Sequence, residues 1–223
     1  MKLYEGSITE FSNDVVRNQI ADIIKDNFLA YYNRSPSESE YRSWQQSFNF
    51  LNNALGFSKL TLNKIIVEYE LPYSTRRIDV LVFGKNKEDK DSVVLMELKQ
   101  WSNEHVHDCE HEGNIVVDFL GKREVAHPCL QVEGYHFDLQ DFLLVFQGDD
   151  SVQLNSCAYC HNYSNQRENI LALPKFHRFT QSFPLFLKED VSALGLYLQD
   201  RLKNSDGLEV FNRFLTRSEE HTS

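Results

Sequence analysis

The chain has 223 residues, of which 41% are hydrophobic and 25% charged, so it is long enough to bury the core of one α/β domain. Its net charge of −10 argues against tight binding of nucleic acid through a broad basic surface, and leaves open a local basic groove or a basic partner. No stretch has the apolar length of a transmembrane helix and the N-terminus lacks a signal-peptide core, so we expect a cytoplasmic protein with no membrane contact and reduced cysteines.

Two long helices are predicted in the first quarter of the chain. Apolar residues recur at helical spacing over residues 13–31. The sequence SPSE then predicts a second helix start, with Ser35 as the cap, Pro36 at the first helical position and Glu38 closing a capping box. This helix is expected to end at Gly56.

Strands are predicted next, over 64–71, 77–84 and 92–99. The polar link KNKEDKD joins the last two as a hairpin. Residues 101–127 contain NIVVDFL, which fits either a strand pair or an irregular loop.

The second half alternates helices and strands. Pro128 predicts the first turn of a helix over 127–142, and Asp190 is expected to cap a later one. Further strands are predicted over 142–148, 152–163 and 183–187, and further helices over 191–202 and 208–215. We therefore predict a single α/β domain over 1–216, a mixed β-sheet flanked by helices, followed by a polar tail over 217–223.

Three charges interrupt the predicted hairpin. Asp79 lies in its first strand, and Glu97 and Lys99 lie in its second, where alternation places both on one side. If the strands pair antiparallel, the two carboxylates and the amine share one end of the sheet. Unpaired buried charges are costly, and Mg²⁺ prefers carboxylate and carbonyl oxygens. A metal site and a plain ion pair at a strand edge are the two interpretations.

This arrangement resembles the PD-(D/E)xK, or restriction-endonuclease-like, nuclease superfamily. There an Asp on one strand and a Glu-x-Lys on the next form the metal site, and Asp79, Glu97 and Lys99 match them residue by residue. Ile78 stands where the motif has proline. The resemblance implies that Asp79, Glu97 and the backbone carbonyl of Leu98 bind Mg²⁺ or Mn²⁺, and that Lys99 orients the attacking water or stabilises charge on the phosphate.

The sequence QVEGY matches the Gln-x-x-x-Tyr pattern of the RecB-like branch of that superfamily. Gln131 and Tyr135 are four residues apart and hence on one helix face, as in any amphipathic helix. The resemblance implies that Gln131 positions Lys99 or the water, and that Tyr135 contacts a phosphate oxygen.

An acidic residue from the first core helix often joins the metal site in this superfamily. Glu40 lies one turn before Trp44, so it is either that metal ligand or a solvated charge near the helix end. Glu68 and Glu70, in the strand before Asp79, are secondary candidates.

The wider pattern of VEYELP, RRIDVLVFG, VVLMELK and QVEGY covers most of residues 60–165. It also resembles the nuclease-like module of bacterial proteins that carry a Schlafen-like superfamily 1 helicase domain. The chain contains no phosphate-binding GKS or GKT loop, so a helicase partner would lie outside this sequence. A role in phage defence or repair is what this resemblance suggests.

The cysteines offer two competing motifs. CAYCH at 157–161 has the form of a c-type haem attachment site, which requires export. Cys157 and Cys160 could instead share zinc with the residues of HVHDCEH, namely His105, His107, Cys109 and His111, or with Cys129. We favour a third interpretation, buried thiols and loop histidines.

The resulting expectation is a metal-dependent hydrolase of nucleic-acid phosphodiester bonds, with DNA favoured over RNA. The alternative is a non-catalytic module of the same fold that binds nucleic acid or docks a partner protein.

Overall fold

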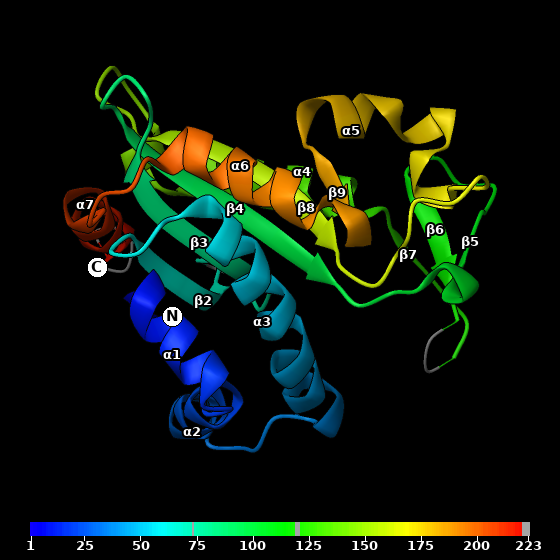
Figure 1. The fold of residues 1–223 in the computed structure, drawn as a ribbon, viewed down its shortest axis with the longest axis horizontal. Helices are drawn as coiled ribbons and strands as arrows, with labels where there is room; N and C mark the ends of the chain where they lie inside the picture. Colours follow the sequence, from blue (N-terminus) through cyan, green and yellow to red (C-terminus); the bar gives the residue numbers. More distant parts are fainter. Residues whose placement is uncertain (73, 119–120, 220–223) are drawn as a thin grey trace.

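The structure is a computed structural model that describes residues 1–72, 74–118 and 121–219. Within these residues the chain forms a six-stranded sheet, a separate three-stranded sheet and seven α-helices (Figure 1). The strands are β1 (Lys2–Ser7), β2 (Lys64–Glu70), β3 (Arg77–Lys85), β4 (Asp91–Lys99), β5 (Val106–His107), β6 (Asn114–Val117), β7 (Arg123–Ala126), β8 (Gln153–Cys160) and β9 (Leu185–Leu187). The helices are α1 (Ile8–Val16), α2 (Ile20–Tyr32), α3 (Glu38–Ser58), α4 (Pro128–Phe142), α5 (His177–Ser182), α6 (Val191–Leu202) and α7 (Leu208–Glu219).

The large sheet has the strand order β1-β2-β3-β4-β8-β9. β1 to β4 pair antiparallel, and β8 and β9 continue the sheet in parallel. A parallel pair needs a crossover, and α4 lies in the connection from β4 to β8. The prediction of an α/β chain with a mixed sheet flanked by helices is confirmed, as are the strands predicted over 64–71, 77–84 and 92–99.

The large sheet separates two hydrophobic cores. One face packs against α1, α2, α3 and α6, and the other against α4, α7 and the three-stranded sheet. In β4, Val94 and Met96 enter the first core, whereas Val93 and Leu95 enter the second. A strand buried on both faces reads as a continuous apolar run, so a charge near its end needs a partner.

The N-terminal region departs from the sequence prediction. Residues 2–7, for which we predict no strand, form the edge strand β1. The single helix predicted over 13–31 is two helices, α1 and α2, because Asn18 adopts a left-handed φ of 57° between them.

The start and end of α3 also differ from the prediction. Ser37 caps the helix and Glu40 closes the capping box, in place of Ser35 and Glu38. The helix passes through Gly56 to Ser58, and Lys59 ends it with a φ of 58°. Packing of the apolar face of α3 against the sheet outweighs the low helix propensity of one glycine.

The second half of the chain agrees better with the elements predicted from the sequence. The predicted helices over 127–142 and 191–202 are α4 and α6. The first four residues of NIVVDFL form the strand β6, paired on both sides within the three-stranded sheet, and its last two lie outside the described residues. The prediction of a strand over 142–148 is wrong, because Leu144–Phe146 in this segment forms a 3₁₀ turn. Other 3₁₀ turns in the described residues are Asn103–His105, Ile170–Ala172, Pro174–Phe176 and Lys188–Asp190.

The C-terminal helix is longer than predicted. α7 continues to Glu219, past the boundary placed at 216, and residues 220–223 of the predicted tail lie outside the described residues. In the part of the chain that the structure describes, no helix is both long enough and apolar enough to cross a bilayer.

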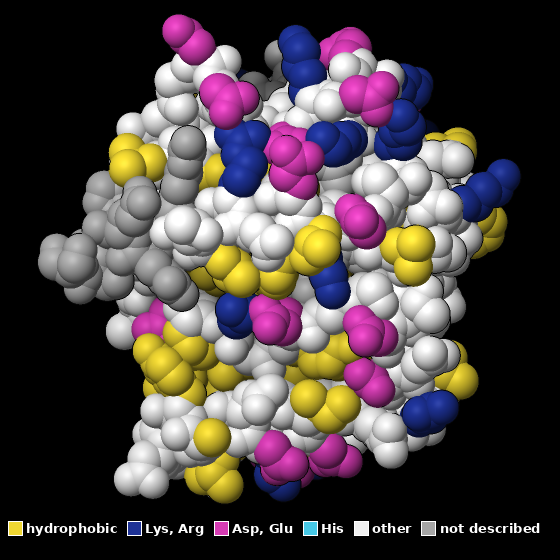
Figure 2. All heavy atoms as spheres, turned by 90° about the vertical axis from the view of Figure 1, so that its left-hand side faces the viewer, with side chains coloured by type: hydrophobic (Ala, Val, Ile, Leu, Met, Phe, Trp, Pro, Cys, Tyr) yellow, Lys and Arg dark blue, Asp and Glu magenta, His cyan; other side chains and the backbone are white. Residues whose placement is uncertain are grey.

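Figure 2 shows the face around α7, where acidic and basic side chains are interspersed. Ion pairs join α7 and the β3–β4 turn to their neighbours, such as Arg213 with Asp91, Lys85 with Glu209 and Lys203 with Asp89. Since this face gathers no single sign of charge, it offers no continuous basic surface for nucleic acid.

Candidate active site

A cavity of about 340 Å³ opens at the carboxyl end of β4, beside α3. In Figure 1 this end of β4 points toward the three-stranded sheet, which supplies Arg123 to the cavity. The other lining residues come from α3, from β2 to β4 and from the segment after β4: Ser39, Ser43, Trp44, Ser47, Phe48, Glu68, Asp79, Glu97, Leu98, Lys99, Gln100 and Trp101. The three charges of the hairpin thus share one cavity.

Strand register places Asp79 beside Glu97. β3 and β4 pair antiparallel with Val80 opposite Met96, so Asp79 and Glu97 come next along the two strands. The Asp79 side chain reaches the backbone of β4, where its Oδ2 accepts a hydrogen bond of 2.7 Å from the N–H of Leu98. This bond fixes one carboxylate oxygen of Asp79 against the end of β4.

Glu97 is the most enclosed charge of the cavity, with 3% of its surface exposed. Its Oε1 accepts hydrogen bonds from Lys99 Nζ at 2.6 Å and from Gln131 Nε2 at 2.8 Å. Its Oε2 is buried and has no hydrogen-bond partner among the described residues. A buried carboxylate oxygen without a donor is costly, so this atom is suited to a cation.

Gln131 and Tyr135 lie on one face of α4, as their spacing predicts. Gln131 Nε2 donates to the Tyr135 hydroxyl at 2.9 Å as well as to Glu97. Gln131 therefore orients Glu97, and the two bonds of its Nε2 go to Glu97 and Tyr135. Tyr135 is only 5% exposed, packs under the guanidinium of Arg76, and is not a lining residue of the cavity.

β2 and β3 are irregular where they reach the cavity. Their ladder pairs Val67 with Val80 and Tyr69 with Ile78, and within the described residues it omits the pair between them. The omitted residue of β2, Glu68, has a φ of 55°, a left-handed conformation that costs a non-glycine residue on the order of 1–3 kcal/mol.

The alternation of side chains changes phase at this point. Val67 and Val80 lie in the core under α3, whereas Tyr69 and Ile78, two residues away on each strand, lie in the opposite core. A regular strand would keep them on the same face. The irregularity directs Glu68 into the cavity, toward α3.

Glu68 is held by two donors. Trp44 Nε1 donates to its Oε1 at 2.9 Å, and Arg77 Nε lies 3.3 Å from its Oε2. Arg77 also donates from Nη2 to Glu40 Oε1 at 2.5 Å and lies over the Phe28 ring. Arg77 therefore joins the β2–β3 hairpin to the start of α3.

Glu40 has two hydrogen-bond partners that we did not predict from the sequence. One oxygen closes the α3 capping box with Ser37, and the other pairs with Arg77. The residue is half-buried, and it is not among the residues that line the cavity. A metal-binding role for Glu40 stays a prediction, and the structure gives it two other partners.

Burial and crowding raise the pKa values of two acidic groups in the cavity, Asp79 and Glu68. The pKa of Asp79 is raised well above its usual value, first by burial and then by the charges of Glu97 and Glu68. Burial raises the pKa of Glu68 to about 6, against the lowering effects of Arg77 and Trp44. Burial disfavours the charged form of Lys99, but Glu97 and Asp79 outweigh it and raise the pKa of the ammonium group.

The raised pKa values of Glu68 and Asp79 indicate that negative charge is crowded in the cavity. Three carboxylates, Glu68, Asp79 and Glu97, line it with two cations, Lys99 and Arg123. Arg77, outside the lining, divides its charge between Glu68 and Glu40. In the described residues, no group of three or more His, Cys, Asp or Glu side chains already has metal-ligand geometry. The fit to a cation therefore depends on the Asp79–Glu97 pair and on the unpartnered oxygen of Glu97.

Sequence analysis did not identify the roles of Arg77 and Trp44, and it ranked Glu68 as secondary. One signal was available: an antiparallel β2–β3 hairpin that pairs Val67 with Val80 places Glu68 opposite Asp79. The contribution of Trp44 has no such signal, because α3 packs across the sheet and brings a residue 24 positions away to Glu68.

The cysteines of CAYCH cannot share one ion in this fold. Cys157 lies in the core under α3, and Cys160 lies in the opposite core, because they are an odd number of residues apart on β8. The prediction that Cys129, Cys157 and Cys160 are buried thiols is confirmed, and burial raises the pKa of each.

The histidines of HVHDCEH lie on the three-stranded sheet and its loops, where they pair with acids. His105 and His107 contact the two carboxylate oxygens of Asp118 at 2.8 and 2.9 Å, and His111 contacts Glu124 at 2.7 Å. Cys109 is half-exposed nearby. These contacts account for the histidines without a metal.

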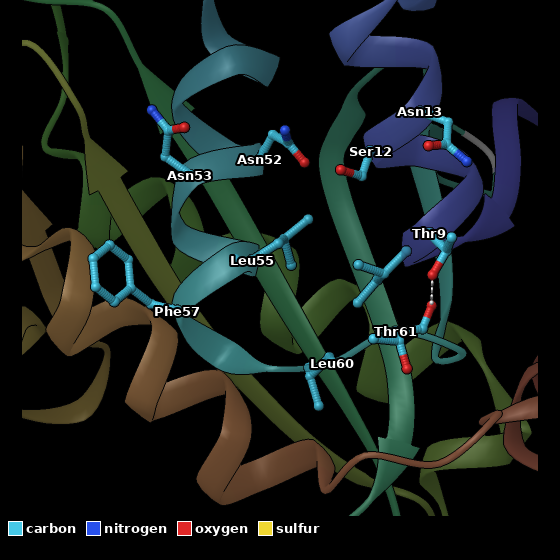
Figure 3. Close-up of a pocket in the computed structure, with 11 residues that line it drawn as sticks. Thr9, Ser12, Asn13, Asn52, Asn53, Leu55, Phe57, Leu60 and Thr61 are labelled. Atoms are coloured by element: carbon cyan, nitrogen blue, oxygen red, sulfur yellow. Dashed lines mark hydrogen bonds between the residues drawn. The ribbon is translucent and has the colours of Figure 1, made fainter.

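A second hollow, of about 520 Å³, lies between α1 and the end of α3 (Figure 3). Its side chains are amides, hydroxyls and apolar groups: Ile8, Thr9, Ser12, Asn13, Asn52, Asn53, Leu55, Phe57, Leu60 and Thr61, with Gly56. Thr9 Oγ1 donates to the backbone oxygen of Thr61 at 3.0 Å. None of these described residues is ionisable, so the hollow lacks a group for acid–base or metal chemistry.

The geometry thus singles out the carboxylate cavity at the end of β4. In comparisons with known proteins, the chain matches no protein-family model and no curated protein.

Proposed function

We propose that this chain is a nuclease of the restriction-endonuclease-like, PD-(D/E)xK type, which hydrolyses phosphodiester bonds of nucleic acid, with DNA favoured, and depends on Mg²⁺ or Mn²⁺. The observation that carries the proposal is the buried, unpartnered Oε2 of Glu97 in the cavity that Asp79 and Lys99 also line. Asp79 and Glu97 would hold the ion with the Leu98 carbonyl. When bound, it would polarise the phosphate and make a water more acidic.

The protein groups around the ion have separable roles. Lys99 is held at 2.6 Å from Glu97, so its ammonium is placed to orient a water or to stabilise negative charge on the phosphate. Gln131 fixes the orientation of the Glu97 carboxylate from α4. The exposed Arg123 adds positive charge at the cavity, where it would meet the phosphate backbone.

Two features of the fold support the same proposal. The mixed sheet flanked by helices agrees with what the sequence resemblance implies. The acidic chain and the mixed charges around α7 favour a local site over a broad basic surface, which suits a module that depends on a partner domain, such as a helicase, to hold nucleic acid.

The test is a cleavage panel of single- and double-stranded DNA, RNA and transfer RNA, with Mg²⁺, with Mn²⁺ and with a chelator. We expect cleavage of DNA that requires metal and is lost in Asp79→Asn. Asp89→Asn is the matched control, because Asp89 lies in the β3–β4 turn and pairs with Lys203 far from the cavity. Metal-independent cleavage, or equal cleavage by Asp79→Asn, would refute the proposal.

A further inference from the structure

Glu68 combines an unfavourable backbone with a functional position. Its φ is a left-handed 55° in the interior of β2, a strand that is paired on both sides. The β2–β3 ladder omits its pairing with Asp79. Only 7% of the residue is exposed, yet its side chain lines the cavity with Asp79 and Glu97. A strand residue without a special role would adopt the regular conformation and point into the core under α4.

The contacts of Glu68 favour its charged form and fix its position, and they leave acceptor positions of the carboxylate unused. Trp44 and Arg77 each engage one of its oxygens, at 2.9 and 3.3 Å. A carboxylate offers about four acceptor positions, so two donors do not saturate it. Arg77 is also shared with Glu40, and the Arg77–Glu40 pair balances its own charge.

The charge balance shows what Glu68 adds. Arg77 and Glu40 balance each other, so the carboxylates of the cavity, Glu68, Asp79 and Glu97, face the charges of Lys99 and Arg123. The cavity keeps an excess of one negative charge, which would be absent without Glu68. The unpartnered Glu97 Oε2 in the same cavity is an independent sign that a cation belongs there. Since three carboxylates do not converge with ligand geometry in the described residues, Glu68 would act from outside the ligand set.

We propose that Glu68 is a positioning residue of the metal centre: as an outer carboxylate, its charge draws the divalent cation to Asp79 and Glu97. The proposal rests on the proposed function, because it concerns the same ion. It places an additional acidic residue of the metal centre on a distorted strand, outside the ligand set, whereas the family resemblance implies a ligand, Glu40, on the first helix.

The experiment measures Mn²⁺ binding by calorimetry, without substrate, on the full chain. Glu68→Gln keeps the volume and the acceptor for Trp44 but removes the charge. Loss of an outer partner of a metal site weakens affinity by roughly 10–100-fold, so we expect about a tenfold loss or more. Glu68→Asn, which tolerates the left-handed backbone, is a second neutral variant with the same expected loss should Glu68→Gln fail to fold.

Two charge-related controls separate this role from a structural one. Glu68→Asp keeps the charge and should bind Mn²⁺ within about threefold of the parent, because Coulomb attraction changes slowly with distance. Glu70→Gln neutralises the next carboxylate of β2, which accepts from Tyr32 away from the cavity, and should leave Mn²⁺ affinity unchanged.

The outcomes distinguish this inference from the proposed function. If Asp79→Asn loses Mn²⁺ binding but both neutral Glu68 variants keep the parental affinity, the role of Glu68 is refuted and the nuclease proposal stands. If Glu68→Asp loses as much affinity as Glu68→Gln, charge is not the cause, and the role is refuted again. A parent protein that binds no Mn²⁺ would overturn both.

Discussion

The carboxylate cavity and the hollow between α1 and α3 differ in what surrounds them more than in size. The one between α1 and α3 is larger, about 520 Å³ against 340 Å³, but is lined by uncharged side chains. The smaller one contains Glu68, Asp79, Glu97 and Lys99 on strands that are buried on both faces. Ionisable groups are rarely held in such places without a partner, so chemical composition identifies the candidate site where volume does not.

The largest expected effect is on catalysis through Lys99. Lys99→Ala removes a donor that stabilises charge in the transition state, so cleavage with Mg²⁺ should fall on the order of 10²–10³-fold while Mn²⁺ still binds. Rates are compared under single-turnover conditions with Lys64→Ala, a lysine at the opposite end of the β2–β3 hairpin. If Lys99→Ala cleaved at the parental rate, the carboxylate cavity would lose its claim to be the catalytic site in preference to the uncharged hollow.

A buried titratable group outside both hollows shows what burial alone does. Nδ1 of His127 accepts from the N–H of Cys129 and its Nε2 donates to the Leu171 carbonyl, so the neutral ring is satisfied. Burial lowers the pKa of His127 to about 4. The unfolded chain binds this proton near pH 6.5, so stability is full above that pH and is lost as the pH falls toward 4, by up to about 3 kcal/mol.

Urea unfolding between pH 7 and pH 4 checks this prediction. His127→Asn keeps a side chain that can cap α4 but does not titrate, so the pH slope in this window should be shallower than in the parent. An identical slope would mean that His127 is not the group responsible.

Metal should stabilise the folded protein through the carboxylate cavity. At a hundred times its dissociation constant, an ion that binds only the folded state adds about 2.7 kcal/mol, or roughly 5–10 °C in melting temperature. Asp79→Asn and Glu97→Gln should each remove this gain. Asp79→Asn should leave the metal-free protein as stable or more so, because it relieves repulsion between carboxylates, whereas Glu97→Gln also takes the ion-pair partner from Lys99 and should lower its stability. A gain that persists in both variants would place the ion elsewhere.

The smallest effect is expected in the uncharged hollow. Asn53 is exposed on α3, so Asn53→Ala should change the free energy of unfolding by no more than about 0.5 kcal/mol and leave cleavage and Mn²⁺ affinity unchanged. Chemical denaturation and the cleavage panel measure both. A large loss of activity would show that this hollow takes part in function.

The sequence by itself determined the hairpin and the chemistry at its end. The apolar runs of β3 and β4, with the polar link between them, are local patterns, and period-two alternation places Glu97 and Lys99 on one side. The spacing of Gln131 and Tyr135 on α4 is equally local. These features depend on neighbours in the chain, so they can be read without the fold.

Only the tertiary structure decided which groups surround those residues. The phase change at Glu68, the Trp44 donor from α3 and the Arg77 bridge to Glu40 all arise from packing between segments distant in sequence. The same holds for β1 and for the break at Asn18, where packing against the sheet outweighs local propensity. The burial that raises the pKa values of Glu68 and Asp79 is likewise a property of the folded layers, so no local pattern could predict it.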